Sequence, residues 1–566
     1  MTKTGGNRQS LDALLAELQA IHADLLRLER EFEPRLGDYA LHKNSARNLI
    51  DYLALRRRDI RQVQEQLAAL GLSSLGRTES HVLAAIEAVL NVVHQLAGQE
   101  WRAPARRERS VGFAKGKSLL RANTDGLLGP PPRKRGVRIM VTMPSEAADD
   151  FELVRQLLAN GMDCMRINCA HDGSNAWGCM VAHLQRAKQE LGIEYRVEMD
   201  LTGPKLRTGS IDPRTQVVKW RPQRDLRGDV TRAAEVWLTP TENPERAPSV
   251  VGGCLHIPAA LLLRIHKGDS IKFKDLRGKS RMLEVANAHG QSRIALSTQT
   301  AYLSAADLLP FTHTSKAKSA TTLSSEARVA PLEQSFIVLK PGDTLVLTRG
   351  PVPGQPAAYD KKSQLTRPAT IPCTLPEVFA DLRPKEPIWF DDGKIGGVTE
   401  SVTPDDVTVR ITIAKTGGDK LGADKGINLS KSKIRLPPLT TNDIADLVFV
   451  VKHANIVGLS FVRRPEDMVA LQAELARLNA SEMGIVLKIE TQTAFEHLPA
   501  ILLQALRGRD VGVMIARGDL AVECGWERLA EVQEEILWFC EAAHVPVIWA
   551  TQVLESLAKN GAPLTC

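Results

Sequence analysis

Apolar residues recur at helical spacing through the first hundred residues. Three runs each place an apolar stripe on one helix face, over residues 11–25, 49–70 and 83–93. Gly98 follows the third run at a position where helices commonly end. This segment contains no catalytic constellation. We therefore predict a helical extension over residues 1–100 that serves packing or oligomerisation.

The pattern changes after a basic, proline-containing linker over residues 101–135. Short apolar runs typical of buried strands then alternate with helix-like segments, which is the pattern of a parallel α/β layer. The predicted strands cover 137–142, 164–168, 195–200, 455–461, 484–490, 511–515 and 545–550. Residues from about 209 to 433 are rich in short β-like runs and turns instead. We predict one α/β domain with a second domain inserted after its third strand.

Polar side chains stand at the ends of three of these predicted strands. Lys488 and Glu490 are two residues apart and so leave the same face of a strand. Arg166 with Asn168, and Glu198 with Asp200, repeat this spacing. In a parallel barrel the catalytic groups project from the carboxyl ends of the strands. The three pairs therefore predict an active site at that end of a (β/α) barrel.

The types of these residues indicate phosphoryl chemistry with a hard cation. Glu490 and Asp519, without any Cys/His cluster, suit Mg²⁺ or Mn²⁺ held by carboxylates and substrate oxygens. Arg517-Gly518-Asp519 is predicted to begin a helix, whose free N–H groups can hold an anion. Positive charge of the kind that phosphoryl transfer uses comes from Arg166, Arg207 and Lys488. A G-x-x-x-x-G-K-[ST] loop is absent from the sequence, so a P-loop would not hold the nucleotide.

Composition narrows the class of protein further. The chain has 566 residues, 43% of them hydrophobic and 25% charged, which is ordinary for a globular protein of several domains. The sequence shows neither a bilayer-spanning apolar run nor a signal-peptide stretch at its start, so we expect a cytoplasmic protein without a membrane partner. The eight cysteines lack paired metal-ligand spacing, and we expect reduced thiols.

The net charge of +7 is concentrated in the linker. Residues 102–135 contain ten Lys/Arg and two acidic residues, which leaves the rest of the chain near neutral. A solvated connector is the simplest interpretation of this charge. Nucleic acid is therefore an unlikely partner.

Seven segments, in order along residues 137–566, resemble motifs of the pyruvate kinase family. Each is similar to one family motif. They are Met165-Arg-Ile-Asn-Cys-Ala-His171, Met199-Asp-Leu-Thr-Gly-Pro-Lys-Leu-Arg-Thr-Gly209, Asp391-Asp-Gly-Lys-Ile395, Lys425-Gly-Ile-Asn-Leu429, Leu487-Lys-Ile-Glu490, Ala516-Arg-Gly-Asp-Leu520 and Ala550-Thr-Gln-Val-Leu-Glu-Ser556. The resemblance implies a TIM-type (β/α) barrel with an inserted β lid domain. It divides the chain, after the helical extension and the linker, into a first barrel segment (136–209), the lid (210–390) and a second barrel segment (391–566).

The resemblance also implies an activity and roles for individual residues. The family transfers phosphate from phosphoenolpyruvate to ADP, which yields pyruvate and ATP in glycolysis. The implied catalytic residues are Lys488, for the transferring phosphoryl group, and Thr551, near the proton delivered to the enolate. Substrate binding would fall to Arg166, Gly518, Asp519 and Thr551, and the Mg²⁺ to Glu490 and Asp519. The implied nucleotide-binding residues are Asn168, His171, Arg207 and Lys425. The lid would close over ADP, and a homo-oligomer is expected.

Two departures from the family pattern qualify these expectations. Many members bind potassium through Asn, Ser, Asp and Thr, whereas the matching positions here are Asn168, Ala170, Asp200 and Leu201. Lys205 stands where potassium-dependent members carry Glu, so we hypothesise that a lysine ammonium replaces the ion and that potassium is not required. The chain also ends at Cys566, soon after its seventh predicted strand. Truncation relative to the family, completion by another chain, and closure by the N-terminal extension are the three explanations, and we favour truncation.

Two other functions remain open at this point. One is an Mg²⁺-dependent lyase or aldolase of the phosphoenolpyruvate/pyruvate barrel superfamily, which shares the metal and enolate chemistry but has no need of the lid or Lys425. The other is a non-catalytic protein that binds phosphoenolpyruvate. Lys488, Glu490, Asp519 and Thr551 argue against that last function, and the missing strand argues for it.

Overall fold

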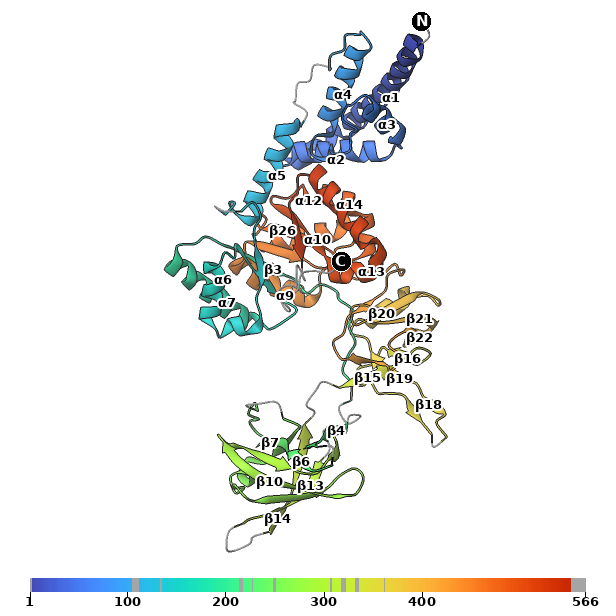
Figure 1. The fold of residues 1–566 in the computed structure, drawn as a ribbon. Coiled ribbons are helices and arrows are strands. Elements are labelled where there is room, and N and C mark those ends of the chain that lie inside the picture. The colour runs from blue at the N-terminus through green and yellow to red at the C-terminus, as the bar shows by residue number, and fades with distance from the viewer. Residues whose placement is uncertain are drawn as a thin grey trace. The chain divides into compact units, whose positions relative to one another are not determined.

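The chain forms two compact units in the computed structural model. The described residues are 3–103, 111–132, 135–212, 217–225, 227–247, 251–305, 308–316, 322–330, 335–360 and 362–550. One unit combines Met1–Lys205 with Arg435–Cys566, and the other is Leu206–Ile434 (Figure 1). We call them unit 1 and unit 2. Unit 2 is thus inserted into unit 1, as the sequence pattern of about 209–433 indicated.

Unit 1 contains a sheet of seven strands, all of whose pairings are parallel. The spatial order is β1-β2-β3-β25-β26-β27-β28, so that β3 and β25 are neighbours across the insertion. The strands are β1 (Met140–Thr142), β2 (Cys164–Asn168), β3 (Arg196–Asp200), β25 (Ile456–Leu459), β26 (Gly484–Ile489), β27 (Val511–Ala516) and β28 (Val547–Ala550). This parallel sheet confirms the predicted barrel-type α/β fold. Within the described residues β1 and β28 are its two edges.

Amphipathic helices follow the strands of this sheet and bury their apolar sides against it. They are α6 (Phe151–Ala159), α7 (Ser174–Leu191), α9 (Thr441–His453), α10 (Pro465–Arg477), α11 (Gln492–Glu496), α12 (Leu498–Ala505), α13 (Arg517–Cys524) and α14 (Leu529–Ala542). Local signals fix where some of them begin. Thr440 and Asp443 form a reciprocal capping box at α9, and the Asp150 side chain accepts from the Leu153 N–H at α6.

The N-terminal helices belong to unit 1 and share its core. They are α1 (Lys3–Phe32), α2 (Lys43–Arg56), α3 (Arg61–Ala69), α4 (Val82–Leu96) and α5 (Phe113–Leu128), with short 3₁₀ segments at Glu33–Tyr39 and Glu79–His81. One continuous hydrophobic cluster includes Leu18 of α1, Leu49 of α2 and Ile536 of α14. The predicted extension is therefore packed onto the sheet's helices.

Polar contacts tie the same helices to the C-terminal part of unit 1. The buried Asn48 amide donates to the carbonyl oxygen of Ala542 at 2.8 Å and to that of Glu79 at 2.6 Å, and its oxygen accepts from Val82 N at 3.0 Å. His544, which is fully buried, lies 3.0 Å from Ser45 Oγ through Nδ1. These bonds satisfy backbone and side-chain groups that burial would otherwise leave unpaired.

Helix α5 packs against the beginning of the central strands. Leu127 lies so close to Gly484 and Gly512 that a Cβ at either glycine would stand 2.7 Å or 2.5 Å from its methyl groups. Leu127 and Leu128 form a small core with Ile456, Val486, Met514 and Ala550. Glycine at the two strand positions therefore makes room for the helix.

Unit 2 consists of β structure in two main sheets. A closed barrel has the strand order β10-β11-β7-β8-β14-β13-β9, and a six-stranded sheet has the order β19-β16-β22-β21-β20-β24. The strands of the closed barrel are β7 (Ala234–Pro240), β8 (Gly253–Ile257), β9 (Ser270–Lys274), β10 (Ser280–His289), β11 (Ser292–Ser297), β13 (Leu308–Thr314) and β14 (Thr322–Ala330). Those of the six-stranded sheet are β16 (Thr344–Thr348), β19 (Ala369–Pro372), β20 (Pro387–Phe390), β21 (Ile395–Val402), β22 (Asp406–Ile413) and β24 (Ile427–Asn428).

Shorter pairs complete unit 2. They are β4 (Val217–Trp220) with β12 (Ala301–Ser304), β5 (Gln223–Arg224) with β6 (Val230–Arg232), β15 (Phe336–Leu339) with β23 (Asp419–Gly422), and β17 (Ala358–Tyr359) with β18 (Leu365–Arg367), besides one turn of helix, α8 (Ala259–Leu262). Unit 2 extends beyond the lid range of 210–390. The reason is that β21, β22 and β24 hydrogen-bond into the sheet begun by β16 and β19, so residues 391–434 fold with it. Among the described residues, no helix is long and apolar enough to cross a membrane.

Candidate active site at the carboxyl ends of the strands

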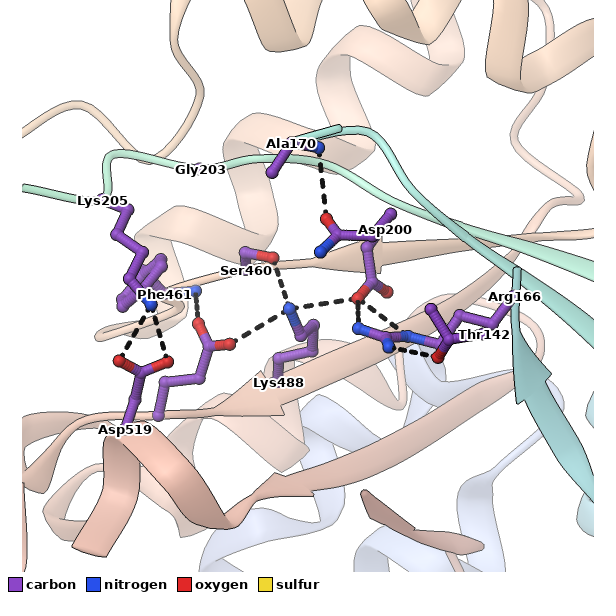
Figure 2. A network of polar contacts seen from close by, with 12 residues as sticks. Thr142, Arg166, Ala170, Asp200, Gly203, Lys205, Ser460, Phe461, Lys488 and Asp519 are labelled. Atoms are coloured by element: carbon purple, nitrogen blue, oxygen red, sulfur yellow. Dashed lines mark hydrogen bonds and ion pairs between the residues drawn. The ribbon is translucent and has the colours of Figure 1, made fainter. Parts of the chain in front are cut away.

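Lys488 is the centre of a polar cluster at the end of β26 (Figure 2). Its Nζ donates to Ser460 Oγ at 2.8 Å and lies 3.1 Å from Asp200 Oδ2 and 3.0 Å from Glu490 Oε1. The side chain is only 9% exposed. Burial alone would lower the pKa of Lys488, but the carboxylates of Asp200 and Glu490 outweigh it and raise that pKa above its ordinary value. The ammonium is therefore charged, and fixed by three neighbours.

Arg166 lies on the other side of Asp200. Its Nε donates to Asp200 Oδ2 at 3.1 Å, a second N–H of the guanidinium donates to the same oxygen, and a third bond reaches Thr142 Oγ1 at 2.7 Å. Burial opposes the ionised forms, yet Asp200 raises the pKa of Arg166, and Lys488 and Arg166 lower the pKa of Asp200. Asp200 therefore serves as the anion that holds two cations side by side.

Glu198 is a second carboxyl group beneath this cluster. Its side chain is fully buried, and its nearest cation is Arg166, whose Nε lies 3.5 Å from Glu198 Oε2. Both of its oxygens, and Asp200 Oδ1, lack an N–H or hydroxyl donor among the described residues, so the hydrogen bond between the Glu198 and Asp200 carboxyl groups needs the proton of Glu198. Burial, with the neighbouring charge of Asp200, raises the pKa of Glu198 well above its ordinary value. Gly458 leaves the space for these carboxyl groups, because a Cβ there would stand 2.1 Å from Asp200 Oδ1.

Glu490 is held by a backbone group as well as by Lys488. Its Oε2 accepts from the N–H of Phe461 at 2.7 Å, and Phe461 has a φ of 54°. A left-handed backbone is strained for a bulky residue and is characteristic of functional sites. Burial, and the charge of Asp519 against the opposing effect of Lys488, raise the pKa of Glu490. Glu490 and Asp519 are thus close enough to influence one another.

Asp519 stands in the first turn of α13 and is engaged by Lys205. The Lys205 ammonium lies 3.0 Å from both carboxylate oxygens, and it lies 5.5 Å from the centre of the Phe461 ring. Both side chains are largely covered, at 19% and 17% exposure. Gly518 is in the same turn, with open space where a Cβ would project. As predicted from the sequence, the helix begins at Arg517. The Arg517 Nε donates to the carbonyl oxygen of Ala550 at 3.2 Å.

The structure brings most of the predicted site residues together. Arg166, Asp200, Lys488 and Glu490 form a connected series of ion pairs within unit 1. Lys205 and Asp519 form a separate ion pair, and the charge of Asp519 raises the pKa of Glu490. Asn168 ends β2, and its Oδ1 accepts from Ala170 N at 3.1 Å. His171 follows on an exposed turn, where its carbonyl oxygen accepts from Trp177 Nε1 at 3.0 Å.

Three predicted residues are not part of this cluster. Arg207 and Lys425 belong to unit 2. There Arg207 donates to the carbonyl oxygen of Asp424 at 3.0 Å, and the Lys425 ammonium lies 3.2 Å from Asp391 Oδ1. Thr551 lies outside the described residues, which end at Ala550.

Three contributors to the cluster were missed by sequence reasoning. Ser460 and Phe461 follow β25, and Thr142 ends β1, so each occupies the same kind of strand end as the residues that were predicted. A search of every strand end for polar residues would have found Thr142 and Ser460. Such a search would not have found Phe461, because it contributes a backbone N–H to Glu490 and its residue type gives no sign of that bond.

The donor set at Glu490 and Asp519 is compatible with a divalent cation. Mg²⁺ in phosphate-handling sites commonly uses one or two carboxylates, with water and substrate oxygens as the other ligands. Within the described ranges, groups of three or more His, Cys, Asp or Glu residues that could hold a metal are absent. Lys488 and Lys205 at present neutralise the two carboxylates. The pair therefore fits a metal that arrives with an anionic substrate.

The fold and the cluster together define a class. A parallel α/β sheet whose carboxyl ends carry interlocked lysine, arginine and carboxylate groups is the architecture of a barrel enzyme. The family model described as "Pyruvate kinase, barrel domain" matches residues 334–565. Residues 334–565 of the chain are thus similar to the barrel domain of the pyruvate kinase family.

Individual relatives agree with this assignment over part of their length. A pyruvate kinase of Clostridium acetobutylicum is 35% identical over 188 residues, which are 33% of this chain and 38% of that protein. One of Bacillus licheniformis is 32% identical over 243 residues, 43% of this chain and 38% of that protein. One of Thermotoga maritima is 32% identical over 237 residues, 42% of this chain and 46% of that protein. The chain thus matches less than half the length of these relatives.

Proposed function

We propose that this protein is a pyruvate kinase-type phosphotransferase, which moves the phosphoryl group of phosphoenolpyruvate to ADP and gives pyruvate and ATP. The observation that carries the proposal is the fixed ammonium of Lys488 between Asp200 and Glu490, with Arg166 bound to the same Asp200. Phosphoryl transfer depends on positioned positive charge around the transferring group. The site supplies two such charges within one network.

The proposed roles follow the geometry of unit 1 where it is described. Lys488 stabilises the phosphoryl group during transfer, and Arg166 orients the phosphate of phosphoenolpyruvate. Gly518 and Asp519 bind substrate at the beginning of α13, where the backbone N–H groups of the first turn have no partners within the helix. Thr551 is proposed to stand near the proton that reaches the enolate, a role that rests on the family resemblance alone.

Glu490 and Asp519 are the proposed ligands of Mg²⁺ or Mn²⁺. When bound, the metal would neutralise phosphoryl oxygens. Lys205 and Lys488 now contact these carboxylates, so they would exchange part of their contacts as the metal and substrate enter. Asn168 and His171 of unit 1, and Arg207 and Lys425 of unit 2, are proposed for the nucleotide or its phosphates on the strength of the resemblance.

Lys205 is proposed to make potassium unnecessary. Its ammonium sits on Asp519 with two 3.0 Å contacts, and so places a permanent monovalent charge beside the proposed metal ligand. Turnover in sodium or Tris buffer should equal turnover with potassium. Replacing Lys205 by Met should create a response to potassium, whereas Lys188→Met, which breaks an exposed pair with Glu194, should not. Strong stimulation of the unaltered protein by potassium would refute this role.

The deciding experiment is a coupled assay with phosphoenolpyruvate, ADP and Mg²⁺ in which lactate production follows pyruvate. Lys488→Met should lower kcat by about 10²–10³-fold, the loss typical of one preorganised charge. Asp519→Asn should instead raise the Mg²⁺ concentration needed for half-maximal rate, while Lys188→Met leaves both quantities unchanged. Pyruvate formation without any need for ADP would contradict phosphoryl transfer.

Location and assembly complete the proposal. A glycolytic role implies the cytoplasm, a homo-oligomer, and neither a membrane nor nucleic acid as a partner. Light scattering of the purified protein during size-exclusion chromatography tests the assembly, and a monomeric mass would overturn it.

A further inference from the structure

A cavity of about 360 Å³ lies between the N-terminal helices and α14, on residues that the proposed chemistry does not use. Its walls come from the end of α2, the beginning of α3, the corner before Glu79 and Trp538 of α14. This volume is at the lower end of the range for small-molecule sites. The cavity thus joins the extension to a helix of the enzyme domain.

Aromatic and aliphatic side chains form much of its surface. Trp538 and Tyr52 stand among Leu55, Ile60 and Leu75. Tyr52 is held edge-on against Phe539, with 5.8 Å between ring centres. Burial raises the pKa of Tyr52 to about 12, so its hydroxyl stays protonated. Charged and polar side chains, among them Arg56 and Glu79, form about half of the lining, so the cavity combines an apolar wall with groups that can fix the orientation of a small organic molecule.

Two of the arginines that line the cavity are already neutralised. Arg58 donates through Nε to Asp24 at 2.8 Å, and a second N–H reaches the same oxygen. Arg61 forms a similar fork on Asp59, with Nε 2.9 Å and 3.1 Å from the two oxygens. These pairs leave little charge for a ligand.

Arg56 and Glu79 differ from those pairs. The Arg56 guanidinium lies 5.5 Å from the centre of the Trp538 ring, and its ion pair with Glu535, at 3.9 Å, is too long for a hydrogen bond. Within the described part of the chain, the Glu79 carboxylate has no ion pair and accepts from its own backbone N–H, while burial raises its pKa. Arg56 acts on Glu79 only through the longer-range charge interaction, so the two opposite charges line one cavity without contact.

We propose that this cavity binds a small dipolar metabolite of the α-amino acid class, with its carboxylate on Arg56, its ammonium on Glu79 and its side chain against Trp538. A guanidinium fork matches a carboxylate, and a carboxylate accepts from an ammonium. A ligand that carries both groups at a short separation satisfies both residues at once. A simple anion or cation would contact only one of the two residues and would forgo the second charge-assisted hydrogen bond.

The test is isothermal titration calorimetry on the full-length protein with each of the twenty amino acids in turn. At least one should bind and also raise the melting temperature of the protein. Its amide, which has no carboxylate, and its deamino analogue, which has no ammonium, should each bind about tenfold more weakly or worse. These analogues test the proposal on the unaltered chain, so it does not depend on whether a variant folds.

Two variants test whether Arg56 and Glu79 bind the charged groups of the ligand. Arg56→Gln and Glu79→Gln should each weaken binding by about tenfold or more. The exposed neighbours Arg57→Gln and Glu65→Gln, which do not line the cavity, should bind as the unaltered protein does. Failure of all twenty amino acids to bind would overturn the proposal, and so would equal binding of an analogue or unchanged binding in either cavity variant. None of these readouts uses the phosphotransferase assay.

Discussion

Replacing Glu198 by glutamine is expected to stabilise unit 1 at neutral pH, by an amount that increases with pH. Glu198 is fully buried, has no hydrogen-bond donor among the described residues, and has a pKa well above its ordinary value, chiefly because of its burial. A group whose pKa is raised in the folded state stabilises that state fully below its unfolded pKa. This contribution is lost as the pH rises through the folded-state pKa. Glutamine has the same shape but no proton to lose, so it removes the pH-dependent penalty.

The size of the stability difference follows from the single proton that Glu198 retains in the folded state. While Glu198 keeps its proton in the folded state and loses it on unfolding, the free energy of unfolding falls by about 1.4 kcal/mol for each pH unit. The glutamine variant should therefore gain about 1.4 kcal/mol relative to the unaltered protein for each pH unit between the ordinary carboxyl pKa and the folded-state pKa of Glu198. The gain begins above the ordinary carboxyl pKa of 4.5 and stops at the folded-state value.

Denaturant unfolding followed by the helical circular dichroism signal measures this difference. All of the described α-helices except α8 belong to unit 1, so the helical signal reports that unit. The exposed residue Glu194 provides the control, because Glu194→Gln makes the same chemical change at a carboxyl group that is not buried. A difference between the Glu198 variant and the unaltered protein that stays constant across this pH range would refute a protonated, buried Glu198.

Three further substitutions test packing and polar contacts described above. Gly458→Ala should lower kcat of the proposed reaction by about tenfold or more, since its methyl group would displace Asp200 and with it Lys488; unchanged kinetics would show that the pocket tolerates the shift. Asn48→Ala should lower the free energy of unfolding by about 2–4 kcal/mol in denaturant titrations, because three backbone groups lose their partner. Leu127→Ala should cost about 2–5 kcal/mol by the same measurement, as for other buried leucines. A loss below about 1 kcal/mol in either stability variant would contradict the contacts assigned to that residue.

The strands and the centre of the site could be predicted because their signals are local. A buried strand alternates its faces, so Lys488 and Glu490, two residues apart, had to share one face. The parallel register then aligned their strand end with those of Arg166 and Asp200. Residue type and strand position were sufficient for these residues.

The remaining contacts depend on distant segments and could not be predicted from local pattern. Lys205 was suspected of replacing a cation, but its partner Asp519 is 314 residues away. Gly458 has no functional side chain, and it matters because the absence of a Cβ leaves space for the Glu198 and Asp200 carboxyl groups. The lid range of 210–390 ended before unit 2 does, because its sheet is completed by strands that are far apart in sequence.

The shared core of the N-terminal helices and α14 has a consequence for how the protein is made. Ser45 meets His544 across 499 residues of sequence, and Asn48 meets Ala542 across 494. At about 5–20 residues per second, the ribosome needs roughly 25–100 s to produce the second member of either pair after the first. During that time the apolar side of α2 lacks its final cover, which makes nascent chains prone to aggregate. We therefore expect the yield of folded protein to depend on chaperones that shield the first hundred residues until the last helices emerge.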